Sequence, residues 1–152
     1  LTGRGTGLDD QGLSHKTELL KRAAARTPAE LTAEDALREY GGFEIAMMTG
    51  AMMGGAASGK IVVIDGFIAT ASALCAARMA PNSRAAFVFA HQSAEAGHRV
   101  LLKALEAQPL LDLNLRLGEG TGALLAVPLI RAAAAMLREM SSFAEAGVSG
   151  PA

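Results

Sequence analysis

The residues of this 152-residue chain that could do chemistry gather in four short segments, three of which contain glycines. These segments are Gly3–Gly7, Asp65–Gly66, His91–Glu95 and Gly118–Gly122. Glu119 lies between two glycines, where its carboxylate can face a ligand and act as a general base. Glycine lets a ligand approach the backbone closely, and the helix N-termini that follow such loops offer free N–H groups to an anion such as phosphate. The residue types therefore indicate a site that combines carboxylate chemistry with anion binding.

Each of these side chains also has a purely structural interpretation. Glu119 could be a first-turn carboxylate that the helix dipole favours, and Asp65 could cap the helix that follows its own strand. Ser93 is of a type that caps helices more often than it binds phosphate. Glu95 and Lys16 are of types that usually lie on solvated helix surfaces. Only the convergence of the segments at one place favours a ligand site over these structural roles.

Three strand–loop–helix units are expected to position these segments. They are Ile61–Ile64 with Phe67–Met79, Ala85–Ala90 with Ala94–Glu106, and Leu110–Leu115 with Thr121–Met140. The polar residues His91–Ser93 are expected to form a turn with Ser93 as the N-cap of the next helix, and Pro128 should kink or interrupt the last helix. Consecutive units of this kind predict an α/β fold, a three-layer Rossmann-like parallel sheet flanked by helices. Ligands bind such sheets at the carboxyl ends of the strands, where the polar segments fall.

The N-terminal part of the chain is expected to be mostly helical. Leu13–Arg26 and Glu44–Ala57 have helical spacing or composition, Thr27–Glu30 resembles a capping box, and Thr32 begins a second candidate cap. A glycine-rich turn such as Gly3–Gly7 normally follows a strand. We therefore expect that N-terminal strands of the sheet are missing and that the chain is the later part of a longer protein.

Composition excludes several classes of function. The formal charge is -1, aromatic residues make up 4% and Trp is absent, which argues against a nucleic-acid partner. The single cysteine, Cys75, cannot form an internal disulfide, which fits a reducing cytoplasm. The most hydrophobic stretch, Ile61–Ala80, contains Asp65 and Arg78, and a charge inside a bilayer costs roughly 2.5–3.5 kcal/mol. We expect a buried strand and helix there, and no membrane partner.

No metal or cofactor is expected. His15, His91 and His98 lack ligand spacing with a second histidine, a cysteine or a carboxylate, so packing or capping roles suit His91 and His98 better. The Gly3–Gly7 segment is not the G-x-G-x-x-G pattern of dinucleotide-binding proteins.

The segments together are identifiable as motifs of one family. In chain order GRGTGLDD (3–10), IDGFIAT (64–70), HQSAEAGH (91–98) and RLGEGTGA (116–123), with the ending 140–147, resemble nicotinate-nucleotide–dimethylbenzimidazole phosphoribosyltransferases. The resemblance covers essentially the whole chain and matches roughly the C-terminal half of a family member. It implies that residues 1–152 are the C-terminal part of a single α/β phosphoribosyltransferase domain.

The resemblance implies a reaction and assigns residues to it. Family members move the phosphoribosyl group of nicotinate mononucleotide to 5,6-dimethylbenzimidazole, giving α-ribazole 5′-phosphate and nicotinate for the lower ligand of cobalamin. The general base of the family falls on Glu119, and its phosphate-binding lysine falls on Lys16. The other residues that the resemblance places at the substrate site are Gly5, Asp65, Gly66, Ser93, Glu95, Gly118 and Gly120.

The resemblance also implies a cytoplasmic homodimer that needs no cofactor. The family's glycine-rich E-M-G-I-G-N-T-T segment, which helps to bind the nucleotide, has no counterpart in these residues. An alternative therefore stays open, in which the chain is a phosphate- or nucleotide-binding α/β module or an inactive fragment. Formation of α-ribazole phosphate from both substrates would distinguish the enzyme from such a module.

Overall fold

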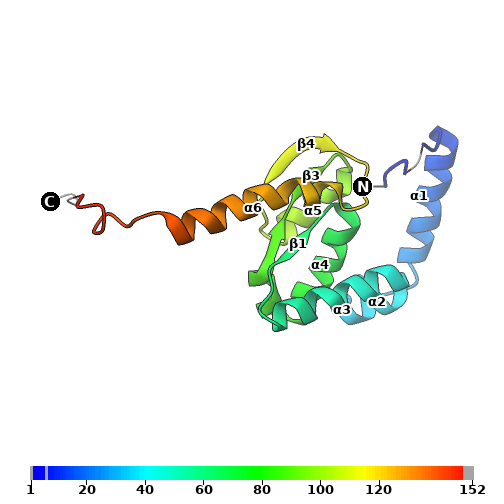
Figure 1. Ribbon diagram of the computed structural model, residues 1–152. Coiled ribbons are helices and arrows are strands. Elements are labelled where there is room, and N and C mark those ends of the chain that lie inside the picture. Colours follow the sequence, from blue (N-terminus) through cyan, green and yellow to red (C-terminus); the bar gives the residue numbers. More distant parts are fainter. Residues whose placement is uncertain (1, 6, 149–152) are drawn as a thin grey trace.

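The computed structural model describes residues 2–5 and 7–148 and shows helices alternating with short strands (Figure 1). The elements in chain order are α1 (Asp10–Ala24), α2 (Ala33–Tyr40), α3 (Phe43–Ala57), β1 (Val62–Ile64), α4 (Phe67–Met79), the 3₁₀ helix η1 (Pro81–Ala86), β2 (Phe87–Phe89), β3 (His91–Ser93), α5 (Ala96–Ala104), β4 (Leu111–Leu115) and α6 (Thr121–Glu139).

The strands form two parallel pairs that adjoin at one residue. Strand β1 is parallel to β2, and β3 is parallel to β4. Ala90 joins the pairs, because its N–H donates to the carbonyl of Ile64 at 2.8 Å and its own carbonyl accepts the N–H of Leu111 at 3.0 Å. Residues 87–93 therefore run between β1 and β4, and the expectation of an α/β fold with parallel strands is confirmed.

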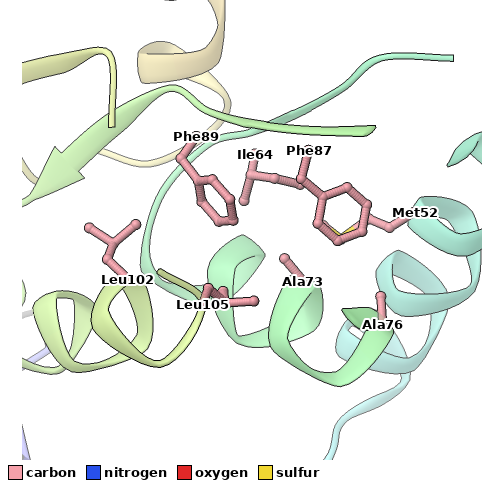
Figure 2. Close-up of a cluster of buried hydrophobic side chains, with 8 residues drawn as sticks. All are labelled: Met52, Ile64, Ala73, Ala76, Phe87, Phe89, Leu102 and Leu105. Carbon is pink, nitrogen blue, oxygen red and sulfur yellow. The ribbon is translucent and has the colours of Figure 1, made fainter. Parts of the chain in front are cut away.

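The hydrophobic core lies between the strands and helices α3, α4 and α5. Figure 2 shows Ile64, Phe87 and Phe89 pointing from the strands toward Ala73 and Ala76 of α4. The two alanines are fully buried, and their small side chains let α4 approach the strands closely. The buried core residues are Met52, Ile64, Ala73, Ala76, Phe87, Phe89, Leu102 and Leu105. This packing fixes the carboxyl ends of β1 and β3 relative to the helices that follow them.

Arg84 of η1 fastens the C-terminal end of α5 to this core. Its Nε donates to the carbonyl of Leu105 at 3.0 Å, and its Nη2 donates to the carbonyl of Glu106 at 3.3 Å. The guanidinium also lies 5.0 Å from the ring centroid of Phe89. It therefore supplies donors to the carbonyls that a helix end leaves without partners and adds a cation–π contact with the core.

The structure corrects the expectation for His91–Ser93. These residues form strand β3 rather than a turn, and α5 begins at Ala96 with Glu95 at its N-cap. The strand continues past Ala90 because β4 pairs with it on the side that β1 leaves free. The alternation of a strand buries His91 and Ser93 while Gln92 stays half-exposed. Strand formation thus turns two polar side chains inward.

One expected helix start is also wrong. Thr27–Glu30 does not begin a helix, because the Thr27 hydroxyl bonds to the carbonyl of Ala24 and to the hydroxyl of Tyr40. The cap at Thr32 is confirmed, since its Oγ1 accepts the N–H of Asp35 at 3.1 Å.

Helix α6 runs through Pro128 without interruption, so of the two expected outcomes, a kink or a break, the break is wrong. Pro128 and Leu124, four residues earlier, are both exposed. Water can therefore take the place of the backbone N–H that proline lacks.

Helix α6 leaves many large apolar side chains uncovered. Leu124 is 72% exposed and Leu137 is 91% exposed, and the C-terminal half of the helix extends away from the strands (Figure 1). In the described part of the chain it is the one helix long and apolar enough to cross a membrane, with a mean hydropathy of 1.4. Length and composition do not distinguish such a helix from one that packs against other protein.

The expected strand and helix within Ile61–Ala80 are confirmed as β1 and α4.

Candidate active site

A cavity of about 780 Å³ lies at the carboxyl ends of β1, β3 and β4. Its wall is made by loops and helix starts that are far apart in the sequence. All nine residues that the sequence places at the site contribute to this wall: Gly5, Lys16, Asp65, Gly66, Ser93, Glu95, Gly118, Glu119 and Gly120. The structure therefore brings the predicted residues together, and their individual roles stay predictions.

Glu119 lies in a turn whose backbone is unusual. Gly118, Glu119 and Gly120 have φ angles of 82°, 57° and 81°, so three successive residues adopt the left-handed region. Glycine occupies that region freely, but for glutamate it costs on the order of 1–2 kcal/mol. The Thr121 N–H closes the turn by donating to the Gly118 carbonyl at 3.0 Å. The turn presents the Glu119 side chain on the cavity wall, where it remains open to solvent.

Asp65 stabilises the helix that follows Glu119. Its Oδ1 accepts the backbone N–H of Ala123, in the first turn of α6, at 2.8 Å. Helix α4, which follows Asp65 in the sequence, begins at Gly66 without a side-chain cap. The structural alternative was therefore wrong about which helix Asp65 caps. The carboxylate instead links the end of β1 to the turn that carries Glu119, and it still lines the cavity.

Lys16 contributes a cation to the cavity from α1. Its Nζ donates to the carbonyl of Gly3 at 3.0 Å. Gly5 has a φ of 59°, and a Cβ there would lie 3.9 Å from the same Nζ. The N-terminal turn thus runs beside the ammonium group, although Thr6 within that turn lies outside the described residues. An ammonium group carries three donors, so Lys16 keeps donors for a bound anion.

A buried histidine fixes the backbone at Ser93. His98 has no exposed surface, its Nδ1 accepts the Ser93 N–H at 2.8 Å, and its Nε2 lies 2.9 Å from the hydroxyl of Thr70. Because Nδ1 is an acceptor here, Nε2 carries the proton and donates to Thr70. Burial, with a smaller contribution from nearby His91, lowers the pKa of His98 to about 4, and Asp65 partly opposes the shift. The packing role expected for His98 is confirmed, and the residue is held as a neutral imidazole.

Ser93 is not the N-cap that the sequence suggested. Its hydroxyl accepts the N–H of Glu95 at 3.2 Å, which shapes the turn before α5, while Glu95 itself is the N-cap residue. Both side chains line the cavity. The hydroxyl keeps its own proton as a donor toward a ligand.

The sequence did not predict the apolar wall of the cavity. This wall combines residues of α3 with residues of β1 and the start of α4: Met48, Met52, Val63, Phe67, Ile68 and Ala69. The methionine run of α3 shows helical composition but carries no signal of which face would meet the loops. A cavity that combines apolar side chains with convergent polar groups suits a ligand that has both an apolar part and an anionic part.

Two further polar residues of the wall were also missed. His91 is buried at the cavity, and Arg116 directly precedes the Glu119 turn. Arg116 also lines an adjoining cavity of about 240 Å³ together with Arg4 and Glu95. Its place at the start of the RLGEGTGA segment is the one signal in the sequence that points to it.

Metal-ligating side chains do not gather anywhere in residues 2–5 and 7–148, where the structure shows no cluster of three or more His, Cys, Asp or Glu. Cys75 lies on α4 outside the cavity wall, and burial raises the pKa of its thiol. The residues that line the cavity can bind an anion through Lys16 and the Ser93 hydroxyl and can accept a proton at the carboxylate of Glu119.

Comparison with known proteins identifies close relatives. A protein of Cupriavidus necator named nicotinate-nucleotide–dimethylbenzimidazole phosphoribosyltransferase is 56% identical over 147 residues, which cover 97% of this chain and 42% of that protein. A protein of the same name from Pseudomonas putida is 53% identical over 152 residues. The crystal structure of CobT from Thermus thermophilus matches with a TM-score of 0.89 at 47% identity, covering 99% of this chain and 45% of that one.

The chain thus spans about two-fifths of the length of the relatives that it matches. The family profile described as DBI_PRT, phosphoribosyltransferase, matches residues 1–148, which is nearly all of the sequence. The cavity built from the four motif segments, the identity above 50% and the shared fold agree with this match. The chain belongs to this phosphoribosyltransferase family.

Proposed function

We propose that this chain carries the proton-accepting and phosphate-holding part of an enzyme that makes α-ribazole 5′-phosphate. The enzyme transfers the phosphoribosyl group of nicotinate mononucleotide to 5,6-dimethylbenzimidazole in the synthesis of the cobalamin lower ligand. The names of the relatives support the reaction. The observation that carries the proposal is the meeting of Glu119, Lys16 and an apolar wall around one cavity.

The reaction is a displacement at the anomeric carbon of the ribose. One ring nitrogen of the benzimidazole forms a bond to this carbon, while the bond to nicotinate breaks and its electron pair stays on the pyridine nitrogen. The attacking ring becomes cationic unless its other nitrogen loses a proton. The Glu119 carboxylate accepts that proton and stabilises the positive charge that develops. General-base assistance contributes about 10²–10⁴ in rate, or roughly 3–5 kcal/mol.

The cavity divides between the two substrates. The ammonium of Lys16 binds the phosphate, and the Ser93 hydroxyl, which also lines the cavity, adds a donor. The apolar wall that includes Met52 and Phe67 accommodates the benzimidazole ring. Glycines at positions 5, 118 and 120 keep the backbone accessible to the nucleotide. Neither the proton transfer nor the binding of the phosphate, as proposed, requires a metal ion.

The test of the base is Glu119→Gln in a protein of full family length that contains this chain. The amide keeps the shape of the side chain and cannot accept the proton, so turnover should fall by about 10²–10⁴ while affinity for nicotinate mononucleotide changes less than about twofold. Glu18→Gln, at an exposed position of α1, is the matched control. Unchanged turnover in Glu119→Gln would reject the assignment. Product formation by the parent, detected by mass spectrometry, excludes the alternative of a non-catalytic module.

We further propose that residues 1–152 act within a single α/β domain of a cytoplasmic homodimer. The exposed apolar side chains of α6 support a protein–protein contact, because patches of this kind mark interaction surfaces. The single cysteine supports a reducing compartment.

A further inference from the structure

His91 is the buried polar residue at the cavity to which the proposed reaction assigns no task. It is 2% exposed, and it stands on β3 where the ends of β1 and β4 also meet the cavity. Within the described part of the chain, its Nδ1 is the one buried side-chain nitrogen or oxygen without a hydrogen-bond partner. An unpaired buried polar atom carries an unfavourable desolvation cost, so the imidazole needs an explanation that an apolar side chain would not.

The His91 ring occupies space that is free only because two neighbouring residues are glycines. A Cβ at Gly122, in the first turn of α6, would lie 1.9 Å from the ring Cδ2. A Cβ at Gly66, where α4 begins, would lie 3.2 Å from Nε2. The ring therefore separates the first turns of α4 and α6 and sets the distance between them. Any larger residue at position 122 would push α6 or the ring out of place.

The same edge of the ring, at Nε2, also faces the carboxylate that holds α6. The His91 Nε2 lies 3.8 Å from Oδ1 of Asp65, and this same oxygen accepts the Ala123 N–H at 2.8 Å. An acceptor beside Nε2 favours the tautomer with its proton on that nitrogen, which leaves Nδ1 as the atom without a partner. The imidazole thus orients Asp65 electrostatically and supports α6 sterically.

We propose that His91 is a positioning residue that directs Glu119 into the cavity by fixing the first turn of α6 through Asp65 and Gly122. The left-handed turn at Gly118–Gly120 needs firm attachment on its helix side, because its glutamate does not adopt that backbone conformation by preference. The inference rests on the proposed role of Glu119 for its effect on catalysis. The positioning itself can be measured without the reaction.

The first experiment follows amide hydrogen exchange by NMR in the 152-residue chain. His91→Leu keeps an apolar bulk but removes the donor, so exchange at the Ala123 N–H should rise about tenfold more than exchange at the Ala90 N–H, which bonds to Ile64. His91→Gln retains a donor toward Asp65 and should change the ratio less than threefold. An equal rise at both amides, or no rise at Ala123, would overturn the proposal.

A second variant covers the case in which His91→Leu does not fold. Asp65 is less buried than His91, and Asp65→Ala removes the carboxylate that accepts the Ala123 N–H. Hydrogen exchange at the Ala123 N–H should therefore rise in this variant as well. His15→Leu, at an exposed position of α1, is the control histidine substitution and should leave the exchange ratio unchanged. If Asp65→Ala leaves Ala123 protected, Asp65 does not hold α6 and the proposal fails.

The second experiment measures turnover in a protein of full family length that contains this chain. His91→Leu should lower kcat by about 10–100-fold with KM for nicotinate mononucleotide within about twofold, and His91→Gln should restore most of the loss. Because His91 acts through Glu119, the double variant with Glu119→Gln should be no slower than Glu119→Gln alone. Additive losses, or a rise in KM equal to the fall in kcat, would contradict positioning. Full turnover in Glu119→Gln would instead refute the proposed function and leave the exchange result to stand by itself.

Discussion

Acidification is expected to destabilise this protein between pH 7 and pH 5 through one buried histidine. The pKa of His98 is about 4 in the folded chain, against 6.5 for an ordinary histidine. The unfolded chain therefore takes up a proton first as the pH falls, so the stabilisation is fully present above pH 6.5 and is lost toward pH 4. Proton linkage with these two values gives a loss of about 2 kcal/mol between pH 7 and pH 5.

The structural reason lies in the hydrogen bonds of the ring. Protonation places a hydrogen on Nδ1, which then cannot accept the Ser93 N–H, and it puts a charge into a fully buried position. A loss of about 2 kcal/mol is a large part of the roughly 5–15 kcal/mol that typically stabilises a domain. The pH range above 5 also separates this effect from the carboxylates, which titrate mostly below it.

Urea unfolding followed by circular dichroism at pH 8, 7, 6 and 5 measures the effect. His98→Asn is the matched control, since the amide oxygen can still accept the Ser93 N–H but does not titrate, and its free energy of unfolding should change about 2 kcal/mol less over this range. NMR titration of the imidazole gives the pKa directly. A His98 that titrates near 6.5, or an equal pH dependence in His98→Asn, would refute the reasoning.

Two further predictions address the cavity. Lys16→Met should weaken binding of nicotinate mononucleotide about 10–100-fold by calorimetry, because a charge-assisted contact contributes roughly 1.5–3 kcal/mol. The same substitution should leave binding of free nicotinate, which has no phosphate, unchanged. Equal losses of affinity for both ligands would contradict a phosphate contact at Lys16. Gly122→Ala should destabilise the fold by about 1–3 kcal/mol in urea unfolding, since the new methyl would overlap the His91 ring. Gly50→Ala in α3, where a Cβ meets nothing within 4 Å, is its control and should be neutral or stabilising; equal effects of the two substitutions would show that the overlap at Gly122 is relieved without cost.

The parallel arrangement and the meeting of the loops could be predicted from the sequence. Polar segments that contain Asp65, Ser93 and Glu119 follow the ends of three runs that the sequence marks as strands. Parallel topology then places all of these ends at one edge of a sheet. Helix α4 agrees with its expected range of Phe67–Met79, because Asp65-Gly66 before it and the proline after it mark its limits. Each of these signals comes from residues that are neighbours in the sequence, so it can be read without knowledge of the fold.

The remaining features depend on contacts between distant residues. Asp65 caps a helix that begins more than 50 residues later, and no spacing rule connects the two positions. The residues His91–Ser93 have turn-like composition, and only the pairing with β4 makes them a strand. The methionine wall of α3 likewise depends on how that helix is rotated against α4. Tertiary packing decides each of these outcomes over local preference.

The two ends of the cavity are held in physically different ways. The turn that carries Glu119 leads into α6, and Asp65 holds the first turn of α6 by accepting the Ala123 N–H. Gly122, in the same turn of α6, packs against the buried His91 ring. Lys16 stands on α1, a helix in which no residue is buried and which lies to one side of the strands (Figure 1). Its side-chain bond goes to the Gly3 carbonyl within the same N-terminal segment. A phosphate that contacts both Lys16 and the Ser93 hydroxyl would therefore attach α1 to the rest of the described fold. Nucleotide binding would then add contacts that hold α1 in place, whereas the turn that carries Glu119 is already attached through Asp65 without a ligand.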